Sequence, residues 1–351
     1  MDEPQSTSKT ELTCFCCGAS TPTLHLGIGC RACAIFYRRV KKSGKRYYCK
    51  TGTSRCDIER DETSACKKCR WSKLESVDST ASTPVLDRLR RNYETLCMVR
   101  QSGELNADGR RKTFRQIAAG ENKLDKATYP TCINSSKILV ESLFDFVGHS
   151  FDEFDSFTEL EKWQVVRNFY ESFVVIEHTH RSEQNFGSDM TRCRFVTGYT
   201  LYLDYNDAEG YFRGRTRGDL KGAKELYKTN LDDAAKCRLA MRECPLDDVE
   251  LVAALGLEMW NCNEGIAPLS DEIMRAFELN RSALLRDLHT YYREVALYPD
   301  YAIRLGRIFC LILQLKSHLP KFRENFTMWR LMNVVTEDED NLAQQLYKLE
   351  M

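Results

Sequence analysis

The chain has 351 residues, of which 42% are hydrophobic and 29% are charged, a composition typical of a folded protein with two or three domains and not of a disordered one. The formal net charge is zero, but residues 14–77 hold 14 Lys and Arg against 5 Asp and Glu, so a basic module is joined to an acidic remainder. The most apolar stretch, residues 308–315, is too short to span a bilayer, and the polar N-terminus has no apolar signal segment. We therefore expect a soluble, intracellular protein with no membrane partner.

Residues 1–13 are polar, and we expect a flexible tail there. Nine of the 16 cysteines then lie between positions 14 and 69, and in a reducing compartment such a cluster indicates metal rather than disulfides. Two cysteines separated by two residues can chelate one ion, and tetrahedral zinc takes four thiolates. Three such pairs and one wider pair supply eight ligands, enough for two closed structural sites: Cys14, Cys17, Cys30, Cys33, Cys49, Cys56, Cys66 and Cys69. The ninth, Cys16, is expected to be a small apolar filler.

A basic segment, CRACAIFYRRVKK, begins at the second cysteine pair. If Cys30 and Cys33 bind zinc from the first turn of a helix, the apolar side chains that follow pack inward: Phe36, Tyr37 and Val40. The basic side chains then project outward, where they can meet phosphates or base edges: Arg38, Arg39, Lys41 and Lys42. A solvated charged face is the alternative, but an orientation fixed by metal together with local basicity favours a helix that recognises nucleic acid.

The next stretch, residues 78–131, is predicted to be a hinge or linker. It opens on the sequence DSTASTP, which is rich in Ser and Thr, and residues 102–123 have the composition of a mobile basic linker. Between them, residues 85–101 have a pattern compatible with a helix.

Helical periodicity dominates residues 132–351 and predicts a mostly all-α, layered domain. Thr158 and Glu161 have capping-box spacing. The residues after them recur at steps of three and four and form one apolar helix face: Trp163, Val166, Phe169, Phe173 and Ile176. His178 and His180 follow, and we expect them in a cap or at the surface.

Three further elements are predicted in this domain. A helix is expected to follow an N-cap at Ser270 or Asp271. Residues 301–320 are apolar nearly all round, which predicts a helix in the middle of a packed layer that stops at Pro320. Weak alternation within residues 193–214 predicts one short hairpin.

The cysteine spacing and the sequence HLGIGCRACAIFYRR closely resemble the DNA-binding domain of nuclear hormone receptors. The form CRAC-x-IF-x-RR, with CDI and CKKCRWSKL after it, is most similar to the supplementary nematode receptors related to hepatocyte nuclear factor. Residues 157–178 resemble the third helix of that family's ligand-binding domain. Residues 259–292 resemble its middle helices, and residues 301–313 resemble its dimer-interface helix.

The resemblance implies a sequence-specific, DNA-binding transcription factor with room for regulation by a ligand. Its fold would be a small zinc-bound, α-rich DNA-binding domain at 14–77 and a ligand-binding-type domain at 132–351. Cys14, Cys17, Cys30 and Cys33 would hold the first of two Zn²⁺ ions, and Cys49, Cys56, Cys66 and Cys69 the second. The family also implies a nuclear location and no enzymatic activity, and the sequence offers no Ser/His/Asp set or phosphate loop for an enzyme.

The resemblance also assigns DNA contacts. The helix beginning at Cys30 would enter the major groove of double-stranded DNA with Arg31, Ala32 and Ala34 at the discriminating positions. Arg31 and Ala34 replace an acid and a lysine of most relatives, so we do not expect a standard half-site. Arg31 fits a bidentate contact to guanine O6 and N7 or a contact to phosphate, and both remain open. Phosphate contacts are implied for His25, Arg38, Arg39 and Arg70.

A final helix is expected near the C-terminus, where Thr336 and Glu339 have capping-box spacing. By resemblance it would bind coregulator proteins, with Gln345 at the family's glutamate position; the residues involved are Leu342, Gln345 and Leu346. A plain amphipathic helix packed on the body is the alternative. The resemblance admits a small apolar ligand and a homo- or heterodimer. The rival function is that of a zinc module that acts by protein contact alone.

Overall fold

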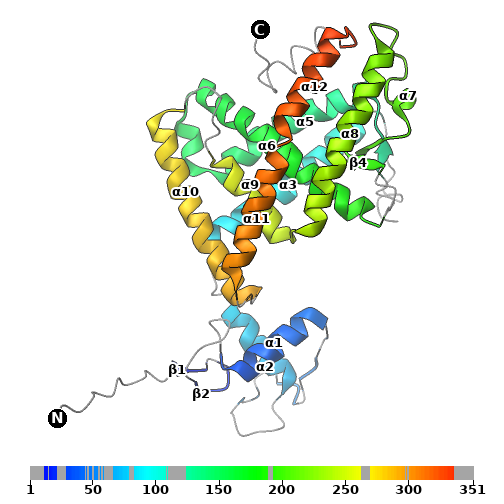
Figure 1. Cartoon of the computed structure of the whole chain (residues 1–351). Helices are drawn as coiled ribbons and strands as arrows, with labels where there is room; N and C mark the ends of the chain where they lie inside the picture. Colours follow the sequence, from blue (N-terminus) through cyan, green and yellow to red (C-terminus); the bar gives the residue numbers. More distant parts are fainter. Residues whose placement is uncertain are drawn as a thin grey trace, which may run out of the picture. The chain divides into compact units, whose positions relative to one another are not determined.

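The computed structural model describes residues 12–14, 16–21, 29–43, 45, 47–49, 51–53, 56, 58, 66–78, 83–107, 109, 124–188, 193–261, 269–296, 298 and 300–335. The chain forms two compact units, one comprising Met1–Pro84 with Arg286–Tyr301 and the other Val85–Leu285 with Ala302–Met351. Figure 1 labels the elements of both.

In the residues that the structure describes, the cysteine-rich module, residues 12–78, contains two strands and two helices. β1 (Leu12–Thr13) pairs antiparallel with β2 (Ser20–Thr21), and α1 (Arg31–Ser43) packs on α2 (Lys67–Asp78), as Figure 1 shows. Besides cysteines, the described core of this module holds only a few buried side chains: Ala19, Ala34, Tyr37, Ile58 and Leu74. A core this small supplies little stability of its own, so the module depends on its metal sites.

Helices make up most of the described chain from Pro84 to Leu331. Along the chain the elements are α3 (Pro84–Ala107), β3 (Asp125–Lys126), α5 (Tyr129–Ser150), the 3-10 helix η1 (Asp152–Ser156), α6 (Glu159–Phe186), β4 (Arg194–Val196), β5 (Leu201–Asp204), α7 (Ala208–Tyr211), α8 (Leu220–Glu243), α9 (Asp248–Met259), α10 (Asp271–Thr290), the π-helix η2 (Tyr291–Val295), α11 (Tyr301–Lys316) and α12 (Leu319–Leu331). The predicted mostly all-α domain is confirmed. Within the described residues, no helix is both long and apolar enough to cross a membrane.

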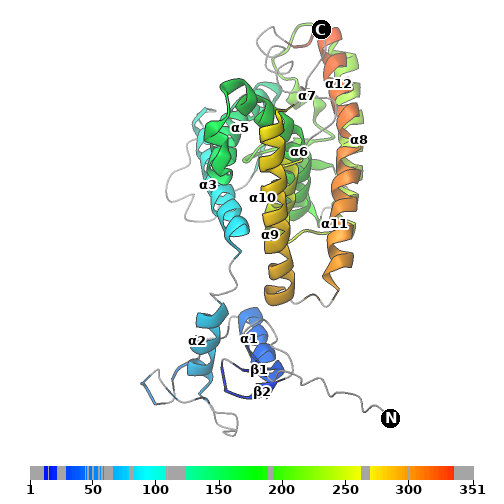
Figure 2. The ribbon, with the colours of Figure 1, turned by 90° about the vertical axis from the view of Figure 1, so that its left-hand side faces the viewer.

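Figure 2 shows the helices in three layers, with α3 and α5 on one side, α6, α9 and α10 in the middle, and α8, α11 and α12 on the other side. The central helix is α6, which contacts α5, α8, α9 and β4. Its start is fixed by the predicted capping box: Thr158 Oγ1 accepts from the Glu161 N–H, and Glu161 Oε2 accepts from the Thr158 N–H at 3.0 Å. The predicted apolar face is buried at Val166, Phe169, Phe173 and Ile176.

The predicted hairpin is confirmed, since β4 and β5 pair antiparallel. A third strand was not predicted: β3 pairs in parallel with β5, which gives the sheet order β3-β5-β4. The side chain of Ser270 caps α10 by accepting from the Ile273 N–H at 3.5 Å, so the helix begins at Asp271 as expected.

The stretch predicted as a linker contains α3, which runs through to Ala107. Its apolar residues are Leu86, Leu89 and Leu96, and all three are buried. The apolar periodicity of α3 is interrupted after Leu96 because the next two buried positions on the helix, Arg100 and Glu104, are charged. Arg100 donates to Glu177 of α6 at 2.8 Å, and Glu104 accepts from the Tyr199 and Thr200 N–H groups at 2.8 and 2.7 Å. These contacts join α3 to α6 and to the turn before β5.

The prediction for residues 301–320 is wrong in two respects. α11 ends at Lys316, and Pro320 lies in the first turn of the next helix, α12, where its missing N–H costs nothing. The helix is also not buried all round, because it lies in the outer layer of Figure 2. Ile303, Phe309 and Leu313 are 63%, 40% and 68% exposed.

Candidate metal centres, nucleic-acid interface and ligand cavity

The first sulfur cluster forms where a tight turn meets the start of α1. Cys14 follows β1, Cys17 lies in the turn before β2, Cys30 precedes α1, and Cys33 lies in its first turn. The turn closes when the Gly18 N–H donates to Cys14 O at 2.9 Å. Gly18 has φ of 66°, a conformation that glycine adopts without strain. The turn therefore brings the first cysteine pair to the helix that carries the second.

The second cluster forms at the start of α2. Cys66 immediately precedes this helix and Cys69 lies in its first turn, while Cys49 and Cys56 come from the preceding segment. The Sγ atom of Cys49 lies 3.6 Å from that of Cys56 and 3.7 Å from that of Cys69.

Both clusters have the dimensions of a tetrahedral zinc site. With Zn–S bonds of about 2.3 Å, the sulfurs of such a site lie about 3.8 Å apart. The Cys17 and Cys30 sulfurs are 3.8 Å apart in the first cluster, and the four ligand atoms of each cluster lie within 4.8 Å of one another. All eight cysteines are free thiols. The predicted division into two four-cysteine sites is confirmed, and the donor set fits two Zn²⁺ ions.

A Zn²⁺ ion bound at either site would offset the negative charge of the four cysteine thiolates and would hold the surrounding chain in place. Burial raises the pKa of Cys17 to about 12, so near neutral pH this thiol keeps its proton until a cation displaces it. Four thiolates close the tetrahedron and leave no position for a substrate. Cys16 is fully buried beside the first cluster, which agrees with the filler role predicted for it.

The helix α1 has one buried face and one exposed, basic face. Its buried residues are Cys33, Ala34, Tyr37 and Val40, whereas the predicted inward residue Phe36 is only partly buried. The exposed side chains include Arg31, Ala32, Arg38, Arg39 and Lys41. Ala34, predicted at a discriminating position, is 4% exposed because it follows Cys33 on the inward face. The exposed face therefore carries the Arg31 side chain and three further cations.

Two contacts fix α1 against α2. The ring of Tyr37 stacks on Trp71 with centroids 4.8 Å apart. Arg70, which follows Cys69, donates from its guanidinium to Cys33 Sγ at 3.2 Å, and its guanidinium carbon lies 4.7 Å from the centre of the Phe36 ring.

Several predicted site residues lie outside the described part of the chain. His25 falls in residues 22–28, and the side chain of Lys42 is likewise outside it. The predicted coregulator residues Leu342, Gln345 and Leu346 fall in residues 336–351.

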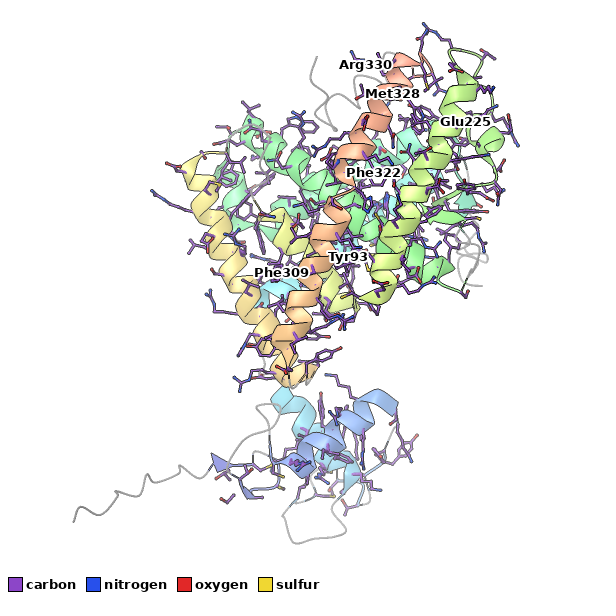
Figure 3. The ribbon with its side chains drawn as sticks, viewed as in Figure 1. Tyr93, Glu225, Phe309, Phe322, Met328 and Arg330 are labelled. Atoms are coloured by element: carbon purple, nitrogen blue, oxygen red, sulfur yellow. The ribbon has the colours of Figure 1, made fainter. Side chains whose placement is uncertain are left out.

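A cavity of about 230 Å³ lies between α6, α8, α12 and the β4–β5 hairpin. Its walls are largely apolar and include Val175 and Val196 from the α6 and β4 side, Leu231 and Ala234 from α8, and Phe322 from α12, which is labelled in Figure 3. Several polar lining groups are paired within the protein, whereas the buried Trp329 Nε1 has no hydrogen-bond partner among the described residues. Glu171 accepts from Arg323 Nε at 2.8 Å, and Arg238 Nε donates to Glu183 at 3.3 Å.

His178 lines the same cavity, so the expectation of a capping or surface role is wrong. Burial lowers the pKa of His178 to about 4, which keeps the ring neutral near pH 7. Its Nε2 lies 3.4 Å from the Arg100 guanidinium, so the ring nitrogen is an acceptor there. His180 is also buried, and burial lowers its pKa as well. The two rings lie two residues apart and therefore on opposite sides of α6, which is packed against α8 and β4 as well as α5 and α9.

These features define a class of protein. A small module with two closed four-thiolate sites presents a basic helix, and a layered helical unit encloses an apolar cavity; the combination is that of a zinc-dependent nucleic-acid-binding regulator with a ligand-binding domain. The family model described as a double treble clef zinc finger of the C4 type matches residues 12–79. The model described as the ligand-binding domain of nuclear hormone receptor matches residues 121–332. The chain therefore belongs to the nuclear hormone receptor family, and it is a ligand-regulated transcription factor and not an enzyme.

Curated relatives place the chain among nematode receptors. The nuclear hormone receptor family member nhr-28 of Caenorhabditis elegans is 24% identical over 375 residues, which cover 93% of this chain and 82% of the relative. Its counterpart in Caenorhabditis briggsae is also 24% identical, with the same coverage. The member nhr-16 of Caenorhabditis elegans is 21% identical and covers 97% of this chain and 98% of its own length. The predicted resemblance to supplementary nematode receptors is confirmed.

Two features of the candidate sites were not predicted from the sequence. Ile35 lies one turn after Arg31 on α1 and is half-buried, and the i to i+4 step from Arg31 could have indicated it. The cavity wall from α12 includes Phe322, Phe326 and Trp329, which recur at helical spacing after Pro320. That spacing was present in the sequence.

Proposed function

We propose that α1 lies in the major groove of double-stranded DNA and that Arg31 contacts a base edge there. The observation that supports this most directly is the division of α1 into two faces. Cys33 and Tyr37 fix the inward face to the metal site and to α2, while Arg31 projects from the first turn of the exposed face. An arginine held at a fixed position can contact guanine O6 and N7 together, which discriminates by about 1–3 kcal/mol against other bases.

The phosphate contacts form a second part of the proposal. Arg38, Arg39 and Lys41 are exposed on α1 and would neutralise phosphates along the groove, together with Lys42 and His25. Ile35 adds an apolar surface next to Arg31 that suits the methyl group of a thymine.

Selection of preferred sites from random DNA tests the role of Arg31. The full chain is expected to enrich a motif that disappears when a chelator removes zinc. Arg31→Gln is then expected to change the preferred base at one position, because glutamine pairs with adenine where arginine pairs with guanine. Weaker binding with the motif unchanged would instead assign Arg31 to phosphate. No enriched motif in the unmodified chain would favour the rival function through protein contact alone.

We also propose that the cavity between α6, α8 and α12 takes a small apolar ligand. Its volume of about 230 Å³ is below the usual range of drug-sized sites, which favours a compact molecule. Most of the lining is apolar and Glu171 pairs with Arg323, so the walls favour a largely apolar ligand, while the buried Trp329 Nε1–H, which has no hydrogen-bond partner among the described residues, is available to donate to a single acceptor atom.

Naphthalene, a compact and uncharged fluorescent probe, tests this cavity. Ala234→Trp fills the cavity from α8 and is expected to abolish specific probe binding. Leu239→Trp is the matched control, because Leu239 lies on the same helix but is 40% exposed. Equal probe binding by both variants would place the probe elsewhere and contradict the proposal.

We further propose a homodimer, a coregulator contact and a nuclear location. Ile303, Phe309 and Leu313 form an exposed apolar side of α11, where Figure 3 labels Phe309. A side chain added at Gly306 on this helix would meet nothing within 4 Å, so a partner backbone could approach closely there. The resemblance of α11 to the family's dimer-interface helix supports a second copy as the partner. The coregulator contact would use Leu342, Gln345 and Leu346.

A further inference from the structure

Arg70 connects the two metal sites through its side chain. It belongs to the first turn of α2, directly after Cys69, a ligand of the second site. Its guanidinium reaches across to the first site and donates to Cys33 Sγ at 3.2 Å. These residues are far apart in the chain, so the contact joins α2 to the start of α1.

The backbone of Arg70 makes a second connection. The Cys16 thiol donates to Arg70 O at 3.9 Å, and Cys16 is fully buried in the core around the first site. Cys33, which accepts from the guanidinium, is fully buried as well. Residue 70 is therefore attached to the first site by both its side chain and its carbonyl group.

The contact between the Arg70 guanidinium and the Cys33 sulfur has an electrostatic basis. Zn²⁺ with four thiolates carries two net negative charges, and a buried thiolate needs hydrogen-bond donors in place of water. A guanidinium supplies both charge and directed N–H groups. The Arg70 guanidinium carbon also lies over the Phe36 ring, 4.7 Å from its centroid, a contact that a lysine side chain reproduces only in part.

We propose that Arg70 is a positioning residue that couples the two zinc sites, holding the Cys33 thiolate from α2 and thereby fixing the orientation of α1. This role differs from the phosphate contact that the family resemblance implies for the residue. It rests on the two four-cysteine sites and not on which base α1 contacts. Residues outside a metal's ligand set that orient its ligands typically change metal affinity by about 10- to 100-fold.

The order in which cysteines lose zinc provides the first test. Full-length, zinc-loaded protein is mixed with excess chelator and an alkylating reagent, and labelled cysteines are identified by mass spectrometry. In Arg70→Gln, the first-site cysteines are expected to react about 10- to 100-fold faster than in the unmodified chain, and before the second-site cysteines. Arg38→Gln removes an exposed arginine of α1 and is expected to react like the unmodified chain.

Damage to α2 alone would give a different order. Cys66 and Cys69 belong to the second site at the start of α2, so a merely distorted helix would expose them first. Earlier labelling of these two cysteines would overturn the proposal. Arg70→Lys keeps the charge and is expected to recover part of the original rate. No recovery would assign the effect to lost packing on Phe36 and overturn the electrostatic role.

The salt dependence of DNA binding provides an independent test. On a short duplex of mixed sequence, loss of one phosphate contact lowers the slope of log K against log salt by about 1. Arg70→Gln is expected to leave the slope unchanged, while Arg38→Gln is expected to lower it by about 1. A lowered slope for Arg70→Gln with unchanged zinc release would assign Arg70 to phosphate and overturn the proposal.

Discussion

Replacing Arg100 by methionine is expected to destabilise the helical unit by about 3–5 kcal/mol, because it leaves a buried carboxylate without its main partner. Arg100 on α3 and Glu177 on α6 lie 2.8 Å apart, and both side chains are fully buried. The same guanidinium contacts His178 at the cavity wall. The substitution therefore affects both the packing of α3 and the ligand cavity.

The magnitude follows from the titration of Glu177. Burial alone would raise its pKa, but Arg100 and then Arg181 lower it from 4.5 to about 2. At 1.36 kcal/mol for each pKa unit, the difference corresponds to about 3 kcal/mol of stability. Because the pKa is lower in the folded protein than in the unfolded chain, this contribution is complete above about pH 5. It is lost as the pH falls toward 2.

Urea unfolding followed by far-ultraviolet circular dichroism measures the effect. Arg100→Met should lower the free energy of unfolding by about 3–5 kcal/mol at pH 7, and Arg100→Met with Glu177→Leu should recover most of it. Lys162→Met is the matched control, because its partner Glu159 is exposed and the pair is expected to contribute less than about 1 kcal/mol. A loss for Arg100→Met no larger than that of the control would refute the reasoning.

Three further predictions concern pH, assembly and coregulators. Burial lowers the pKa of His178 from 6.5 to about 4, so the chain should lose stability as the pH falls from about 6.5 to 4. His178→Gln should reduce that loss in urea titrations. If the pH profile of the variant equals that of the unmodified chain, the ring is not buried in its neutral form. Leu313→Glu places a charge on the exposed apolar side of α11 and should shift the chain from dimer to monomer in sedimentation velocity, whereas Glu324→Gln, an exposed position on α12, should leave the assembly unchanged. Gln345→Glu adds a charge-assisted hydrogen bond and should strengthen binding of a coactivator peptide by about tenfold in a titration; unchanged affinity would favour a plain terminal helix.

Local sequence patterns were sufficient to predict eight zinc ligands in two sites and the start of the central helix, whereas the division of the ligands between the sites came from the family resemblance. Each zinc site takes at least one cysteine pair separated by only two residues, so the spacing itself carries the geometry. The start of α6 could also be predicted from local spacing, because Thr158 and Glu161 satisfy each other's hydrogen bonds within one turn.

Contacts between distant segments could not be predicted in this way. The donation from Arg70 to Cys33 depends on how α2 crosses α1, and the parallel pairing of β3 with β5 joins segments separated by two long helices. The last turns of α3, residues 102–107, were predicted as linker because the buried charge Glu104 breaks the apolar pattern, although Glu104 finds its partners on the turn before β5. The burial of Ala34 could not be predicted either, because a side chain this small fits both an exposed and a buried position.

With the role proposed for Arg31, affinity for DNA and specificity for its sequence would have different sources. The 14 basic residues between positions 14 and 77 attract phosphates whether or not the module is folded. The orientation of Arg31, by contrast, depends on a 13-residue helix that is too short to be stable alone. Cys33 fixes that helix to the first zinc site, and Tyr37 and Arg70 tie it to the helix of the second. With the roles proposed for Arg31 and Arg70, both zinc sites would therefore influence which bases are contacted, even though the described ligands of the second site lie outside α1.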